Sequence, residues 1–76
     1  MNIRFKTAVG IIHANAIPTM QTLGDQPWQV RLRGTAGDLL LSCTVDESSA
    51  REAATEAVRF FLDCRKGIPT KEFSII

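Results

Sequence analysis

A single helix-forming segment in the second half of the chain limits the folds that this sequence can adopt. Ser49, followed three residues later by Glu52, fits a capping box, in which each side chain satisfies a free backbone N–H at a helix start. Gly67 suits the position just beyond a helix end and Pro69 cannot continue a helix, so we expect the helix to end at about Lys66. One helix cannot bury its apolar side alone, so the rest of the chain has to supply a surface for it.

The apolar side chains of this segment cover about half of the helix circumference at about 100° per residue. They are Ala50, Ala53, Ala54, Ala57, Val58, Phe60, Phe61, Leu62 and Cys64. An arc of this width is broader than one face of a sheet needs. We therefore expect its edge to be covered by the tail (residues 68–76), by a long connection elsewhere in the chain, or by a second copy of the protein.

A hairpin is predicted immediately before the helix. Trp28–Arg33 alternates apolar and polar side chains, which is typical of a strand with one buried face. The run Gly34–Asp38 is rich in turn residues, and Leu39–Val45 is a second apolar run of strand length. Two such runs around a glycine-containing turn predict an antiparallel hairpin.

The N-terminal part adds at least one more strand. Asn2–His13 also alternates, and Gly10 within it predicts either one bent strand or two short ones. Within the tail, Lys71–Ile76 ends in apolar residues that suit a last short strand. The chain of 76 residues is expected to be one domain, 1–76, of the α+β class. We expect two layers: an antiparallel sheet of three strands, or four if the tail adds one, and one long C-terminal helix packed on one face.

The charge balance and the apolar runs limit the partners. A formal net charge of +1 disfavours both a strongly basic nucleic-acid-binding arm and a strongly acidic mimic of DNA. No apolar run is long enough to cross a membrane, and the basic start is not followed by the apolar core of a signal peptide. Two cysteines are too few for a disulfide-dense secreted scaffold. These observations predict a cytoplasmic protein that does not engage membranes.

Catalytic and metal-binding residues are sparse. The one histidine is His13, and Cys43 and Cys64 fall in an apolar strand and on the apolar arc of the helix, where cysteine usually acts as a small hydrophobic residue. No spacing of cysteine and histidine resembles a metal site, and no glycine-rich phosphate loop is present. We expect a non-enzymatic protein with no catalytic residues, no metal and no cofactor.

Four cations form the first candidate binding site. If the apolar residues of the strands face the helix, then Arg4, Lys6, Arg31 and Arg33 must all point the other way, onto the open face of the sheet. One interpretation is an ordinary solvated outer face, which antiparallel sheets commonly have. The alternative is a docking surface for phosphate or for an acidic protein.

The second candidate lies in residues 13–27, which are expected to form a long connection. Ile17, Met20 and Leu23 recur at a spacing of three, and Pro18 suits the first position of a short helical turn. Long connections in small domains are often functional. These three apolar residues are expected either to plug the open end of a small core or to form a contact patch for a protein partner.

Two resemblances bear on function. The segment WQVRLRGTAGDLLLSCTVDESSAREAATEAVRFFL resembles the strand–turn–strand–helix start of HicB-type antitoxins. The residues that fill this family's pattern of a capped helix with spaced alanines and a terminal aromatic–leucine pair are Ser49, Glu52, Ala53, Ala57, Phe61 and Leu62. In size and layout the whole chain is similar to small phage-encoded inhibitors, including some anti-CRISPR proteins. That similarity implies a short, non-enzymatic protein that acts by occupying a surface of a host complex.

The sequence thus predicts a small protein-binding inhibitor that occludes a nucleic-acid-handling complex, with a protein or nucleoprotein as its partner. The first alternative is a weak nucleic-acid-binding domain that uses the basic sheet face, since the predicted β-β-β-α order is shared with double-stranded-RNA-binding domains. The remaining alternatives are a HicB-like antitoxin and a structural protein whose broad helix arc builds a homodimer.

Overall fold

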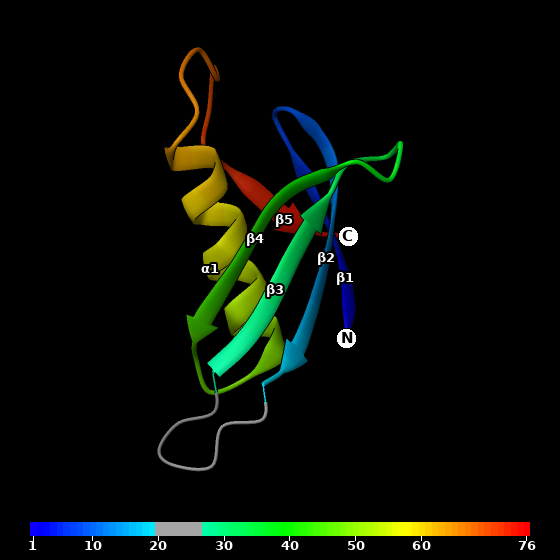
Figure 1. The fold of residues 1–76 in the computed structure, drawn as a ribbon. Coiled ribbons are helices and arrows are strands. Elements are labelled where there is room, and N and C mark those ends of the chain that lie inside the picture. The colour runs from blue at the N-terminus through cyan, green and yellow to red at the C-terminus, as the bar shows by residue number, and fades with distance from the viewer. Residues whose placement is uncertain (20–26) are drawn as a thin grey trace.

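The computed structural model describes residues 1–19 and 27–76 and shows one antiparallel sheet with one helix (Figure 1). The predicted α+β class is confirmed, but the sheet has five strands rather than three or four, in the spatial order β4-β3-β2-β1-β5. The elements in chain order are β1 (Asn2–Thr7), β2 (Gly10–Pro18), β3 (Pro27–Arg33), β4 (Leu39–Asp46), α1 (Ala50–Asp63) and β5 (Phe73–Ile75).

The additional strand arises at Gly10. This residue has a φ of 104°, a conformation that glycine adopts without steric cost, and it allows a tight connection between β1 and β2. The Thr7 side chain supports the turn, because its Oγ1 donates to the Gly10 carbonyl at 2.7 Å and accepts from the Val9 N–H at 3.1 Å. Of the two alternatives for Asn2–His13, two strands is therefore the one observed.

Strand β2 extends much further than expected. The prediction that a long connection begins at His13 is wrong for residues 13–18, which complete β2 and pair with both β1 and β3. Ala14 and Ala16 are buried and alternate with His13, Asn15 and Ile17, which are exposed. Alanine is depleted in strands and gives little apolar contrast, so the period of two was not visible in the sequence.

The predicted hairpin before the helix is confirmed as β3 and β4. Its turn is closed by the Gly34 N–H bonded to the Asp38 carbonyl at 2.9 Å, with Gly37 at a φ of 84°. The Trp28 side chain ties the start of the hairpin to the segment before the helix, because its indole N–H donates to the Glu47 carbonyl at 2.9 Å.

The helix begins where the sequence predicts and ends slightly earlier. Ser49 Oγ accepts from the Glu52 N–H at 3.2 Å, as in a capping box, but the Glu52 carboxylate accepts from the Ser48 hydroxyl at 2.7 Å rather than reaching the Ser49 N–H. Helix α1 ends at Asp63. The cation at its C-terminus is Lys71 of the tail, whose ammonium group donates to the carbonyls of Leu62 and Arg65 at 2.5 and 2.7 Å.

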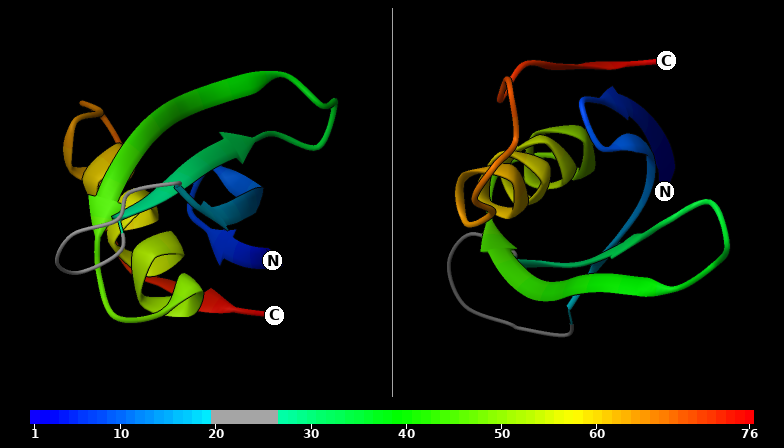
Figure 2. Two further views of the ribbon diagram at one scale, coloured as in Figure 1. Left: turned by 60° about the horizontal axis from the view of Figure 1, so that its bottom comes forward. Right: turned by 90° about the horizontal axis from the view of Figure 1, so that it is seen from above.

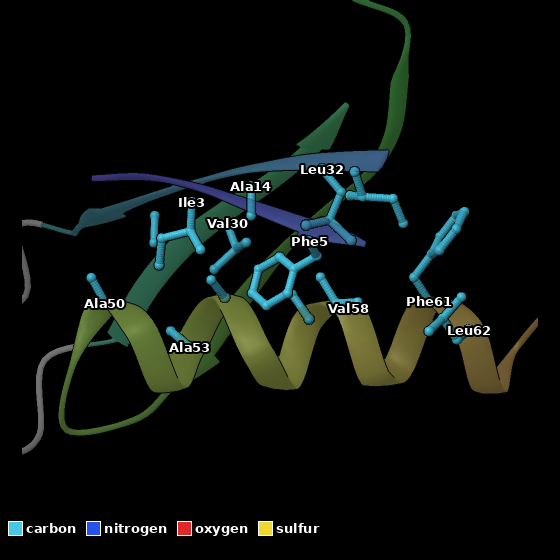
Figure 3. Close-up of a cluster of buried hydrophobic side chains, with 14 residues drawn as sticks. Ile3, Phe5, Ala14, Val30, Leu32, Ala50, Ala53, Val58, Phe61 and Leu62 are labelled. Carbon is cyan, nitrogen blue, oxygen red and sulfur yellow. The ribbon is translucent and has the colours of Figure 1, made fainter. Parts of the chain in front are cut away.

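The core lies between α1 and the inner face of the sheet, which curves around the helix (Figure 2). Strand and helix side chains meet there in one cluster (Figure 3). Its strand members are Ile3, Phe5, Ile12, Ala14, Ala16, Val30 and Leu32, and its helix members are Ala50, Ala53, Ala54, Ala57, Val58, Phe61 and Leu62. Eight of these fourteen residues are alanines or valines, so the helix backbone can lie close to the sheet.

The two edges of the apolar helix arc differ in how far they are covered. On one side the tail covers it, since Ile68 and Phe73 pack against the core and the Phe73 ring meets the edge of Phe5 with centroids 5.8 Å apart. On the other side Phe60 is 56% exposed, and Cys64 at the helix end is exposed as well. Among the described residues, α1 is the only helix, and it is too short and too polar to cross a membrane.

The close contact between β2 and α1 makes a testable prediction. Ala16→Leu inserts a large side chain where Ala16 is fully buried, and we expect it to lower the free energy of unfolding by about 1–3 kcal/mol through overpacking. Ile17→Leu, one residue along on the exposed face, is the control and should change stability by less than about 0.5 kcal/mol. Urea denaturation measures both; equal losses would contradict the assignment of faces on β2.

Candidate functional site: the basic sheet face

The outer face of the sheet carries the four cations named from the sequence. On β1, Arg4 and Lys6 are exposed and alternate with buried Ile3 and Phe5. On β3, Arg31 and Arg33 are exposed and alternate with buried Val30 and Leu32. Because side chains alternate across a strand, all four point away from α1. We call the outer surface of β1, β2 and β3 that bears these four cations the basic face.

Strand β2 lies between the two pairs of cations. It is paired with β1 on one side and with β3 on the other, so the backbones that carry the two pairs are about 10 Å apart. The outward residues of β2 between them are Ile11, His13 and Asn15. The register places Lys6 opposite Ile11 and Arg31 opposite Asn15, so each of these cations has a neutral neighbour across the strand.

His13 occupies the centre of this arrangement. It pairs with Arg4 on β1 and with Arg33 on β3, which gives a row of three nitrogen-bearing side chains across three strands. This central position was not predicted from the sequence, which placed His13 where the strand Asn2–His13 was expected to give way to the connection 13–27. The pairing of β2 with β1 follows from the tight turn at Gly10, whereas its pairing with β3 joins residues distant in the chain, and the sequence carries no local signal for that register.

The cations of the basic face lack carboxylate partners among the residues that the structure describes. The salt bridge found in that part of the chain joins Arg59 to Glu56, two exposed residues of the helix. Arg33 donates to the Gly37 carbonyl at 3.1 Å, which orients its guanidinium group without neutralising it. Arginine side chains in this state can form paired hydrogen bonds to carboxylates or phosphates.

The apolar residues predicted to accompany the cations are found in part. Ile17 lies at the end of β2 on the outer side of the sheet, where it is 39% exposed and pairs with Gln29. It therefore does not plug the core. Met20 and Leu23 lie outside the described residues. Ile11, opposite Lys6, and Leu39, which pairs with Arg33, add exposed apolar surface that the sequence analysis did not assign to this face.

Acidic residues gather elsewhere, around the start of α1. The group consists of Asp46, Glu47, Glu52 and Glu56, of which Glu52 lies in the first turn of the helix. Partial burial, together with the negative charges of Glu52, Glu56 and Asp46, raises the pKa of the Glu47 carboxyl above its usual value. Four of the nine lysine and arginine residues thus lie on the outer face of the sheet, and four of the eight acidic residues lie around the start of the helix.

The residues considered for catalysis or metal binding do not come together. His13 is on the outer face, whereas Cys43 pairs with buried Val30 and so points to the helix side. Burial raises the pKa of the Cys43 thiol, which disfavours the reactive thiolate. Cys64 is exposed at the end of α1. Within residues 1–19 and 27–76, no group of three or more histidine, cysteine or acidic side chains is arranged to hold a metal ion.

The acidic group at the helix start predicts a pH-dependent stability. A carboxyl whose pKa is raised by folding destabilises the fold above that pKa, and the penalty disappears below the ordinary glutamate value of about 4.3. Glu47→Gln should therefore raise the melting temperature at neutral pH and leave it unchanged near pH 4. Thermal unfolding at both pH values measures this. Glu72→Gln, on the exposed tail, is the control; an equal gain from Glu47→Gln at both pH values would contradict the assignment.

Comparison of the chain with models of known protein families, with characterised proteins and with solved structures finds no significant match. The basic face is therefore the feature of the molecule that bears on function.

Proposed function

We propose that the protein is a non-enzymatic binding module that docks its basic face on an acidic surface of a larger protein and thereby occludes that surface. The observation that carries this proposal is the set of four exposed cations, Arg4, Lys6, Arg31 and Arg33, without a carboxylate partner among the described residues. Such a face attracts an anionic partner and orients it during the encounter.

The surroundings of the cations favour a protein partner over a nucleic acid. Ile11, Ile17 and Leu39 expose apolar surface on the same side of the sheet, and arginine together with apolar side chains is typical of protein interfaces. Sheets that bind single-stranded nucleic acid present aromatic rings on which bases stack. Here Phe5 is buried against the helix, and Trp28 bonds to the Glu47 carbonyl on the helix side.

The size of the molecule is compatible with this role. A stable interface of standard size takes about 800 Å² from each partner. That area is about a sixth of the 5006 Å² of accessible surface of this chain, so one face of the sheet with its margins suffices. In its most specific form, the proposal is an inhibitor of the anti-CRISPR kind that occupies a nucleic-acid-handling complex. Ile17, Met20 and Leu23 would then supply apolar contact beside the cations.

Charge reversal on the basic face tests the proposal. Arg31→Glu with Arg33→Glu should abolish capture of the partner from a lysate by the tagged protein, because truncating or reversing desolvated charges at an interface costs several kcal/mol, on the order of 2–5. The capture is run with and without nuclease and read by mass spectrometry. A protein recovered by the unmodified chain in both conditions, and lost with the double variant, is the expected result.

Arg51→Glu with Lys66→Glu provides the matched control. Both residues are exposed in or beyond α1, away from the basic face, and the two double variants lower the net charge by the same amount. The control should retain the partner. Equal loss with both double variants would show that net charge alone is responsible, and recovery of nucleic acid alone, lost on nuclease treatment, would replace the protein partner with a nucleic acid.

The edge of the sheet at β4 favours a second candidate function, self-association. Strand β4 is an edge strand, and its inward residues Leu41, Cys43 and Val45 are only half-buried beside exposed Phe60. From Leu39 to Val45 it has neither a charged residue nor a proline, which are the usual protections of an open edge. A homodimer formed along this margin would cover Phe60.

Thermal unfolding at increasing protein concentration tests the homodimer. Stability linked to association makes the melting temperature rise with concentration. Phe60→Glu should remove that dependence, since it places a charge in the contact, whereas Phe60→Leu should keep it. A melting temperature independent of concentration in the unmodified chain would exclude the homodimer in the range measured.

A further inference from the structure

The inference concerns His13 and rests on the proposed function. His13 is surrounded by all four cations of the basic face. Arg4 and Arg33 are directly opposite it on the neighbouring strands, and Lys6 and Arg31 occupy diagonal positions. Side chains directly opposite in an antiparallel pair have Cβ atoms about 4.5–5.5 Å apart, and diagonal ones about 7–8 Å apart. A ligand that neutralises these cations therefore lies against the imidazole ring as well.

The other groups around His13 are neutral. On its own strand the outward neighbours are Ile11 and Asn15, and helix α1 lies on the opposite side of the sheet. The only carboxylate on strands β1 to β5 is Asp46, at the end of β4, where it pairs with Pro27 rather than with a residue beside His13. Outside the strands, Asp38 lies in the turn after Arg33, and Ile76, whose N–H bonds to the Arg4 carbonyl at 3.0 Å, brings the terminal carboxylate of the given chain to the β1 side. Among the described residues no salt bridge joins either group to a cation of the basic face, so the charges at the strand positions beside His13 are positive.

Binding of an acidic partner changes the charge around His13. Histidine is the side chain whose charge ordinarily changes between about pH 5 and pH 8. Carboxylates placed over Arg4 and Arg33 bring negative charge to the ring between them, and a protonated imidazole donates strong, charge-assisted hydrogen bonds to such groups. Binding and protonation then favour each other.

We propose that His13 is a proton-linked contact at the centre of the basic face, so that the protein takes up a proton when it binds an acidic segment of a partner protein. The partner chemistry is a run of aspartate or glutamate side chains that crosses β1, β2 and β3 along the row Arg4, His13, Arg33. Affinity for such a segment rises as the pH falls from 8 to 6, while the carboxylates of the partner stay ionised.

The experiment uses fluorescently labelled poly-L-glutamate as the probe and the full chain as the protein. Binding is measured by anisotropy at low ionic strength, where screening is weak, from pH 8 down to about pH 6. We expect binding to tighten about three- to tenfold over this range. His13→Gln should bind weakly with little dependence on pH. His13→Lys, which carries a permanent charge, should bind tightly at every pH tested.

Both variants are expected to fold, because His13 is exposed, and thermal unfolding verifies this. The same pH dependence in the unmodified chain and in His13→Gln would overturn the role of His13 while leaving the proposed function intact. Absence of binding by the unmodified chain at every pH, or binding that Arg31→Glu with Arg33→Glu leaves unchanged, would overturn the proposed function itself. Tighter binding of labelled oligothymidylate than of poly-L-glutamate would replace the acidic segment by a phosphate backbone.

Discussion

One alanine-rich face of helix α1 packs closely on strand β2, and the other elements are arranged around this contact. Ala14 and Ala16 of β2 are buried beneath a helix that itself presents Ala50, Ala53, Ala54 and Ala57. Small side chains on both surfaces let the helix and sheet approach closely, so the larger residues Phe5, Leu32 and Leu62 can fill the space around this contact. A core this small tolerates few changes of volume, since a chain of this length buries only about 60% of its unfolded surface.

The same contact determines which residues lie on the outer face of the sheet. No charged or polar side chain of the described residues is buried in the core, so each strand that packs on the helix turns its polar residues outward. On β1 and β3 those residues are mainly arginine and lysine, and on β2 they include the histidine between them. The basic face is thus a direct product of strand alternation and of a wholly apolar interior.

The parts of the fold that could be predicted from the sequence are those with local signals. The hairpin of β3 and β4 follows from alternation around a glycine turn, and the helix start follows from Ser49 and Glu52. The residues of the basic face could also be predicted, because the alternation of side chains along a strand separates Arg4 and Arg31 from their apolar neighbours. This alternation does not indicate which strands are adjacent. The position of β2, and with it the central place of His13, depends on long-range pairing and on alanines that look neutral in a sequence. The capping of α1 by Lys71 of the tail is equally non-local.

The short strand β5 has a consequence for how the sheet meets other molecules. It covers the free side of β1 over three residue pairs and is held there by the Lys71 contacts with the end of α1. Strand β5 is then the edge of the sheet on that side, but with three residues it offers few free backbone groups to an added strand. The eight residues of β4 form the longer open edge, so backbone pairing with another chain is favoured on the β4 side.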